Sequence, residues 1–328
     1  MDDETPMLEG MTMTVGYRPA VYWSWEFRRL QVDYLDGIDP EYFSYQVDLL
    51  APELNGSNAQ RAAVAIRTYY SQALETLFAL LGSSVQSPLS PAPWMLHYKI
   101  SDLCDLIDVI RQELSIRNRM SLPYLSWKSI AEKITPWQIG DSTAEHIDAM
   151  VLAMRRFANE FQDDQFQEEY NSIKHGLRVR PGGSFLAFGI QHTPGVPASA
   201  DQMNVMYSYR FGSSFLKSES LSERKFQYAF FRAARNWDYE NISERVKIIC
   251  ACIGNTLAYL KLRNGFDPAS IPFYQLSVRQ VDEAVDGAVS LGAFTMNRRI
   301  EAAWVDSLSR EEILNSYPPP HSPDVALD

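Results

Sequence analysis

The chain has few cysteines for its length. Its three cysteines, Cys104, Cys250 and Cys252, all lie in apolar helical patterns, where a small buried side chain is the expected role. Cys250 and Cys252 are two residues apart and point to different faces of a helix, which argues against a shared metal ion. The sequence therefore excludes a disulfide framework and favours a reducing compartment.

Signals for export or membrane insertion are also missing. The N-terminal residues, Met1 to Glu4, are acidic and are not followed by the apolar core of a signal peptide. No apolar run approaches the length needed to cross a bilayer. We expect a cytoplasmic protein with no membrane partner.

Common catalytic motifs are missing as well. There is no glycine-rich nucleotide loop, and Gly182-Gly183 marks a turn with no helix opening after it. The chain has no His-Glu-x-x-His sequence and no serine nucleophile elbow. Its five histidines are scattered: His97, His146, His175, His192 and His321. We therefore expect no metal and no cofactor.

Basic residues are outnumbered in this chain. It carries 30 lysines and arginines against 41 acidic residues, for a formal charge of -11. Long-range attraction to nucleic acid is thus disfavoured, and any such binding needs a local basic patch. The apolar share of 46% in 328 residues is that of an ordinary globular protein with ample core.

Apolar residues recur at spacings of three and four over much of the chain, which predicts amphipathic helices. Asp39-Pro40 is expected to open a short helix that runs to Leu50. Gly82 is expected to end the first long helix, and a capping box, Ser142 to Glu145, to open another. The predicted helices span residues 58–81, 96–114, 127–134, 142–175 and 246–264.

The pattern changes from helical to alternating after Gly176. Arg180 to Gly183 indicates a turn, and residues 184–190, 205–217 and 226–237 have the aromatic-rich composition of strands. Alternation at residues 21–27 fits a short strand or a helix. Short connections predict an antiparallel sheet. The aromatic side chains are suited to stacking on bases, but packing a sheet onto helices is their commoner use.

The predicted fold class is mainly α, an up-down helical bundle with a small inserted antiparallel β-sheet. A single helical domain is expected over residues 19–316, with the β insertion at about 180–238. Residues 1–18 are expected to be flexible, and the proline-rich residues 317–328 to form a disordered tail. The segment 274–316 has mixed patterning and gives no assignment.

The segment Tyr170 to Gly176 is the main candidate for a functional site. Asn171 and His175 are four residues apart, so both lie on one face of a helix, with Lys174 beside them at the helix end. A structural role is equally open, because His175 and Lys174 would complement the helix dipole and Gly176 would end the helix. Asn171 could likewise be a buried amide that joins two helices.

This segment resembles the signature of HEPN-domain proteins, helical bundles whose motif is arginine, often asparagine, three residues and histidine. Asn171 and His175 match that motif, and the resemblance covers residues 58–264. It implies a homodimer in which two motifs face each other across a cleft. In active members it implies RNA cleavage without metal, and it suggests bacterial defence or a toxin-antitoxin system.

The family's arginine is missing. Tyr170 takes its place, preceded by Glu168 and Glu169 within an acidic run, residues 163–169, that is expected to be a solvated face. A carboxylate cannot stabilise the charge of a phosphoryl transition state. Lys174, Arg178 and Arg180 form a basic cluster next to His175, and Arg210, Arg232 or Arg235 would approach if the sheet covered the helix end.

Three functions remain open. The first is a catalytically degenerate HEPN-like module that dimerises and binds RNA, a nucleotide or a protein partner, with Arg178 and Arg180 contacting phosphate. The second is an active metal-independent ribonuclease in which His175 is the general acid and base, Asn171 orients it, and Lys174 or Arg178 replaces the missing arginine. The third is a helical scaffold unrelated to this family.

Overall fold

The computed structural model describes residues 10–12, 15–16, 22–24, 28–116, 118–135, 143–190, 195–196, 198–220, 228–286, 290–298, 311–312 and 315. The predicted flexible start therefore lies largely outside the described residues, and the predicted tail and Ser142 lie wholly outside them. Within these residues the protein is mainly helical with small antiparallel sheets, which confirms the predicted fold class.

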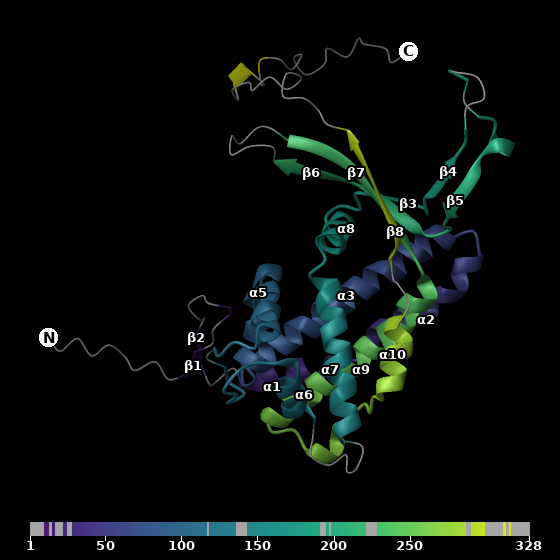
Figure 1. The fold of residues 1–328 in the computed structure, drawn as a ribbon. Helices are drawn as coiled ribbons and strands as arrows, with labels where there is room; N and C mark the ends of the chain where they lie inside the picture. The colour runs from purple at the N-terminus through teal and green to yellow at the C-terminus, as the bar shows by residue number, and fades with distance from the viewer. Residues whose placement is uncertain are drawn as a thin grey trace, which may run out of the picture.

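Two long helices form the centre of the helical body (Figure 1). Helix α3 (Ala59–Gln86) packs along α9 (Tyr239–Arg263), and α7 (Thr143–Phe161) lies against both. Their apolar stripes meet in one core that includes Leu77 of α3, Phe157 of α7 and Ile249 of α9. The surrounding helices are α1 (Arg28–Asp36), α2 (Tyr42–Leu50), α4 (Pro91–His97), α5 (Ile100–Arg111), α6 (Trp127–Ile134) and α10 (Val278–Asp286).

Gly82 does not end the first long helix, so that prediction was wrong. Helix α3 continues to Gln86, and a side chain at position 82 would place its Cβ 2.5 Å from Cη2 of Trp94. Gly82 is present because the indole of Trp94, on α4, packs directly against the α3 backbone. Contact between helices, and not helix termination, explains this glycine.

The predicted helix over residues 142–175 is two helices. Helix α7 ends at Phe161, and α8 (Asp164–Lys174) begins after Asp163. The carboxylate of Asp163 accepts a hydrogen bond from the Phe166 backbone N–H at 2.8 Å, as an N-cap does. This break allows α8 to leave the direction of α7 and to lie under the sheet.

Four antiparallel strands form the larger sheet, in the order β3-β6-β7-β8. Strand β3 (Val179–Pro181) is a short edge, β6 (Gly212–Ser220) and β7 (Tyr228–Trp237) are central, and β8 (Ser290–Arg298) is the other edge. Strand β8 comes from the segment that gave no assignment, so the sheet extends beyond the predicted insertion at 180–238. Strand β7 leads directly into α9 through Asp238, which caps that helix.

A separate two-stranded ribbon pairs β4 (Phe185–Phe188) with β5 (Asn204–Ser208) and projects away from the helical body in Figure 1. The predicted strand over 205–217 is thus two strands, β5 and β6, which belong to different sheets. A further short pair joins β1 (Gly10–Thr12) to β2 (Tyr22–Ser24), so the described part of the alternating segment is a strand.

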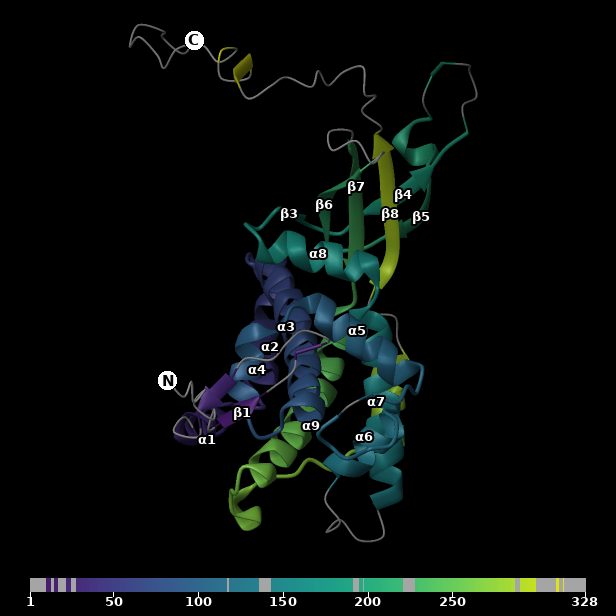
Figure 2. The same ribbon diagram turned by 90° about the vertical axis from the view of Figure 1, so that its left-hand side faces the viewer.

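Helix α8 lies between the larger sheet and the rest of the helices, as Figures 1 and 2 both show. Ser213 and Lys217 of β6 contact glutamates of α8, so these alternate residues face the helix. Side chains alternate along a strand. Ser214 and Leu216 therefore face the opposite side, where Leu216 is 69% exposed. We call that side the outer face of the sheet.

Candidate functional site

Helix α8 ends at the predicted motif. Gly176 has φ 92° and Leu177 has φ 51°, so the chain turns sharply after His175. The N–H of Arg178 donates to the carbonyl of Ser172 at 2.7 Å and satisfies one of the last helix carbonyls. Strand β3 begins one residue later. The motif therefore does terminate the helix, which is the structural role that the sequence left open.

Tyr170, the residue before Asn171 in the predicted motif, does not face solvent. Its side chain is 3% exposed, and its hydroxyl donates to Oε2 of Glu75 on α3 at 2.8 Å. Burial, together with the nearby Glu75 carboxylate, raises the pKa of Tyr170 above its ordinary value. Tyr170 therefore stays neutral and points into the helical body, away from any ligand at the helix end.

Lys174 is held by the same carboxylate. Its Nζ lies 3.3 Å from Oε2 of Glu75, in an ion pair that is partly exposed. Tyr98 also donates to Glu75, at 3.1 Å. Glu75 thus collects a lysine and two tyrosine hydroxyls, and Lys174 is directed towards α3 and not towards His175.

His175 and Asn171 remain near the surface. His175 is exposed, and its backbone N–H donates to the Asn171 carbonyl at 3.0 Å. Asn171 is half-buried, and its side-chain amide group makes no hydrogen bond with the described residues. Arg178 is exposed and folds back, with Nη2 3.4 Å from the Asn171 carbonyl oxygen. The structure thus brings Asn171, His175 and Arg178 together at one helix end.

The interpretation of the acidic run 163–169 as a solvated face was wrong for Glu169, whereas Asp163 and Asp164, at the start of α8, are exposed. Glu169 is 1% exposed and forms an ion pair with the equally buried Arg67 of α3. Glu168 pairs with Lys217 on β6, and Asp163 pairs with Arg235 on β7. These carboxylates attach α8 to α3 and to the sheet, so they do not form an acidic surface beside the motif.

Arg180 takes part in a different site. It lines an open pocket of about 510 Å³ on the outer face of the sheet, together with Arg232 from β7. We call this the arginine pocket. Its lining residues are Arg180, Pro181, Gly182, Gly183, Ser184, Phe185, Ser214, Arg232 and Ala234.

The wall of the arginine pocket is a turn that needs glycine. Gly182 has φ 128°, a conformation that other residues rarely adopt. A Cβ at Gly183 would lie 1.9 Å from the carbonyl oxygen of Tyr209, so the backbone passes too close for any side chain. The predicted turn at Arg180 to Gly183 is therefore present, and it sets the position of Arg180 relative to β6.

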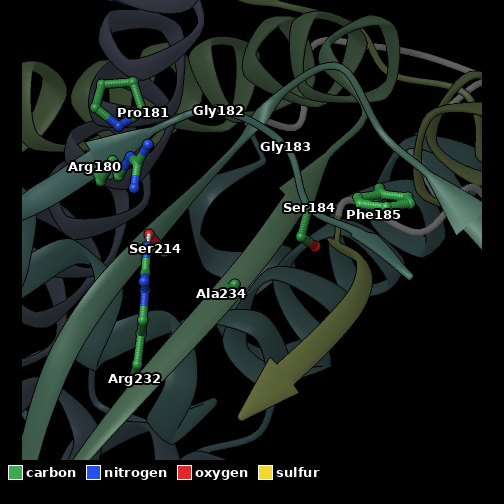
Figure 3. A pocket seen from close by; sticks show the side chains of 9 residues that line it. All are labelled: Arg180, Pro181, Gly182, Gly183, Ser184, Phe185, Ser214, Arg232 and Ala234. Atoms are coloured by element: carbon green, nitrogen blue, oxygen red, sulfur yellow. Dashed lines mark hydrogen bonds between the residues drawn. The ribbon is translucent and has the colours of Figure 1, made fainter. Parts of the chain in front are cut away.

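Two arginines converge inside this pocket. Figure 3 shows the side chain of Arg232 extending from β7 to Ser214, with the guanidinium of Arg180, on β3, on the other side of that serine. Nη2 of Arg232 donates to Oγ of Ser214 at 3.2 Å. Among the described residues, no carboxylate lines the pocket and neither arginine forms an ion pair. The described lining of the pocket therefore carries positive charge on an acidic protein.

Sequence reasoning placed Arg232 only among arginines that would approach the helix end, and it did not identify Ser214. The strand register would have placed these residues together, because Arg180 is opposite Ser214, and Ser214 is opposite Ala234. Arg232 lies two residues from Ala234 on the same face. That register depends on where β6 begins, which the merged strand prediction obscured. Arg235 instead binds Asp163 at the other end of α8.

The described residues contain no group of three or more histidine, cysteine or acidic side chains placed to hold a metal ion. None of their helices combines the length and apolar character that crossing a membrane requires. In comparisons with known protein families, with curated proteins and with solved structures, this chain matches none of them.

Proposed function

We propose that this chain is a HEPN-like module that binds RNA without cleaving it. The main observation in support is the placement of Tyr170, which is buried and bonded to Glu75 where an active member of that family would present an arginine. Lys174, one of the two cations that could replace the arginine, is tied to Glu75. The other, Arg178, lies near His175 but donates to the Asn171 carbonyl, so among the described residues no cation is held beside His175 in the place of that arginine to stabilise transition-state charge.

The exposed groups at the end of α8 are suited to binding. Arg178 is exposed, forms no ion pair with another described residue and uses one guanidinium nitrogen on the Asn171 carbonyl, and His175 and Asn171 add polar groups beside it. Contacts of this kind hold the phosphate backbone with little sequence preference. The proposal includes a symmetric dimer in which a second His175 faces the first.

RNA binding tests this function directly. We expect single-stranded RNA to bind in a fluorescence anisotropy titration. Arg178→Gln should lower the affinity, and it should also make the slope of log affinity against log salt concentration shallower by about 0.7, because one phosphate contact is lost. Arg279→Gln, which removes an exposed arginine on α10, should leave both unchanged. Equal effects of the two substitutions would show that the end of α8 is not the binding site.

Cleavage is tested separately. We expect intact RNA after long incubation with the protein and chelator. If the RNA is degraded, and His175→Ala abolishes that degradation while the fold is retained, the active ribonuclease is the correct function and the proposal fails. If neither binding nor cleavage occurs, the scaffold function is favoured.

The dimer is tested by cross-linking. We expect His175→Cys to form an intermolecular disulfide under mild oxidation, because the two residues face each other in the proposed assembly. Leu96→Cys, at an exposed position on α4, is the matched control and should not cross-link. Equal cross-linking of both variants would contradict the proposed symmetry.

A further inference from the structure

We infer that the arginine pocket binds a mononucleotide through its terminal phosphate, with the base against Phe185. This goes beyond the RNA contacts proposed for the end of α8, because the pocket lies on the opposite, outer face of the sheet. Its volume of about 510 Å³ is within the range of small-molecule sites.

The donors that remain free in this pocket are side chains. The backbone N–H groups of Gly182 and Gly183 donate to the carbonyls of Gly212 and Arg210, and that of Ser184 donates to Asn236. These N–H groups are therefore not available to a ligand. The guanidinium of Arg180 makes no hydrogen bond with the described residues, and Arg232 uses one nitrogen on Ser214. The hydroxyl of Ser214, which accepts that bond, can donate its own proton to an anion.

Two converging guanidinium groups favour a phosphate monoester. Arginine binds phosphate oxygens through paired N–H groups, and two arginines supply two positive charges to one centre. A terminal phosphate carries between one and two negative charges at neutral pH, whereas a diester within an RNA strand carries one. The charge of the pocket therefore matches the end of a nucleotide better than the interior of a strand.

The aromatic ring of Phe185 defines the rest of the ligand. Phe185 is 65% exposed, lines the pocket and lies beyond Ser184 from the arginines in Figure 3. An exposed aromatic ring can stack on any base. The arrangement of phosphate donors at one end and an aromatic ring at the other is suited to a nucleoside monophosphate, free or at the phosphorylated end of RNA.

Calorimetric titration with adenosine 5′-monophosphate tests the inference. We expect binding by the wild type, and a loss of about tenfold or more for Arg180→Gln and for Arg232→Gln, because each removes a charged donor. Arg178→Gln keeps the pocket intact and should bind as the wild type does. All three positions are exposed, so thermal melts should show retained folding.

Adenosine and inorganic phosphate separate the two halves of the site. Adenosine should bind far more weakly than its monophosphate. Phe185→Leu should weaken binding of the nucleotide and leave binding of inorganic phosphate unchanged. Failure of the monophosphate to bind, or equal binding by the wild type and both arginine variants, would overturn the inference.

Short RNAs identify the source of the phosphate and keep the two proposals apart. If RNA with a 5′-phosphate displaces the mononucleotide and the same RNA with a 5′-hydroxyl does not, the pocket accepts RNA ends. If neither displaces it, the pocket accepts the free nucleotide. RNA binding that depends on Arg178, without nucleotide binding, would support the proposed function and reject this inference. Nucleotide binding without RNA binding that depends on Arg178 would support this inference and reject the proposed function.

Discussion

Arg67 and Glu169 form an ion pair inside the protein, with Nη2 of the arginine 2.8 Å from Oε2 of the glutamate and both side chains 1% exposed. The other carboxylate oxygen accepts hydrogen bonds from Ser213 and Trp237, at 2.6 and 2.9 Å. One glutamate therefore joins α3, α8, β6 and β7. The orientation of α8, and with it the position of the motif at its end, depends on this carboxylate.

Glu169→Ala should lower the free energy of unfolding by about 3–5 kcal/mol, because it leaves the buried charge of Arg67 without its partner. Chemical denaturation measures the change. Glu168→Ala is the matched control, since that neighbouring glutamate forms only a partly exposed pair with Lys217 and should cost about 1 kcal/mol or less. Similar losses for both variants would contradict a special role for Glu169.

The part of the fold that follows from local patterns was predictable. The stripes of α3, α6 and α9 bury one face in the core, and the spacing of apolar residues indicates this directly. The length of α3 was not predictable. Glycine often ends a helix, but Gly82 lies within α3 because the ring of Trp94, on another helix, packs against the backbone there. Tertiary contact overrides local preference at this position.

A prediction follows from that contact. Gly82→Ala should lower the free energy of unfolding by about 1–3 kcal/mol, since the new methyl group would overlap the Trp94 ring, even though alanine favours helices more than glycine. Gly56→Ala is the control, because its φ of -98° suits alanine and its nearest neighbour would lie 3.5 Å away. The control should change stability by less than about 0.5 kcal/mol. Stabilisation by Gly82→Ala would disprove the packing explanation.

The candidate site was predictable in its residues but not in its geometry. Asn171, His175 and Arg178 do lie together, because they are close in sequence at one helix end. Arg180 was grouped with them, yet the strand pairing directs it to Ser214 and Arg232 on the outer face. Long-range register decides which side chains share a pocket, and a single sequence shows no such register.

Stability at acidic pH depends on His146. Its ring is fully buried, Nδ1 accepts a hydrogen bond from the Leu276 N–H at 3.0 Å, and Nε2 has no partner among the described residues. Burial lowers the pKa of His146, and protonation of Nδ1 would also break the hydrogen bond that it accepts from Leu276. The folded protein thus prefers the neutral ring, while the unfolded chain takes up a proton near pH 6.5.

Because the unfolded state binds this proton more readily, the stability contributed by neutral His146 is complete well above pH 6.5 and falls as the pH drops towards the folded pKa. We expect a loss of up to about 1.4 kcal/mol per pH unit across that window. His146→Gln can still accept from Leu276 and does not titrate, so its stability should fall less than that of the wild type from pH 7 to 5. Parallel pH profiles of denaturation would contradict the assignment.

Glu75 limits the positive charge that α8 offers to a ligand. It holds Lys174 through an ion pair and also accepts hydrogen bonds from Tyr170 and Tyr98. Glu75→Gln keeps an acceptor for the tyrosines but removes the charge that binds Lys174. On the proposed function, this substitution should raise RNA affinity, because the freed ammonium can contact phosphate.

The measured signature is the dependence of RNA affinity on salt. One additional phosphate contact should steepen the logarithmic slope by about 0.7 for a single strand. Glu283→Gln frees an arginine, Arg279, on α10 in the same way and serves as the control for net charge. If Glu283→Gln raised the affinity as much as Glu75→Gln did, overall charge would explain the gain. A larger effect of Glu75→Gln, abolished by adding Lys174→Gln, would locate RNA at the end of α8.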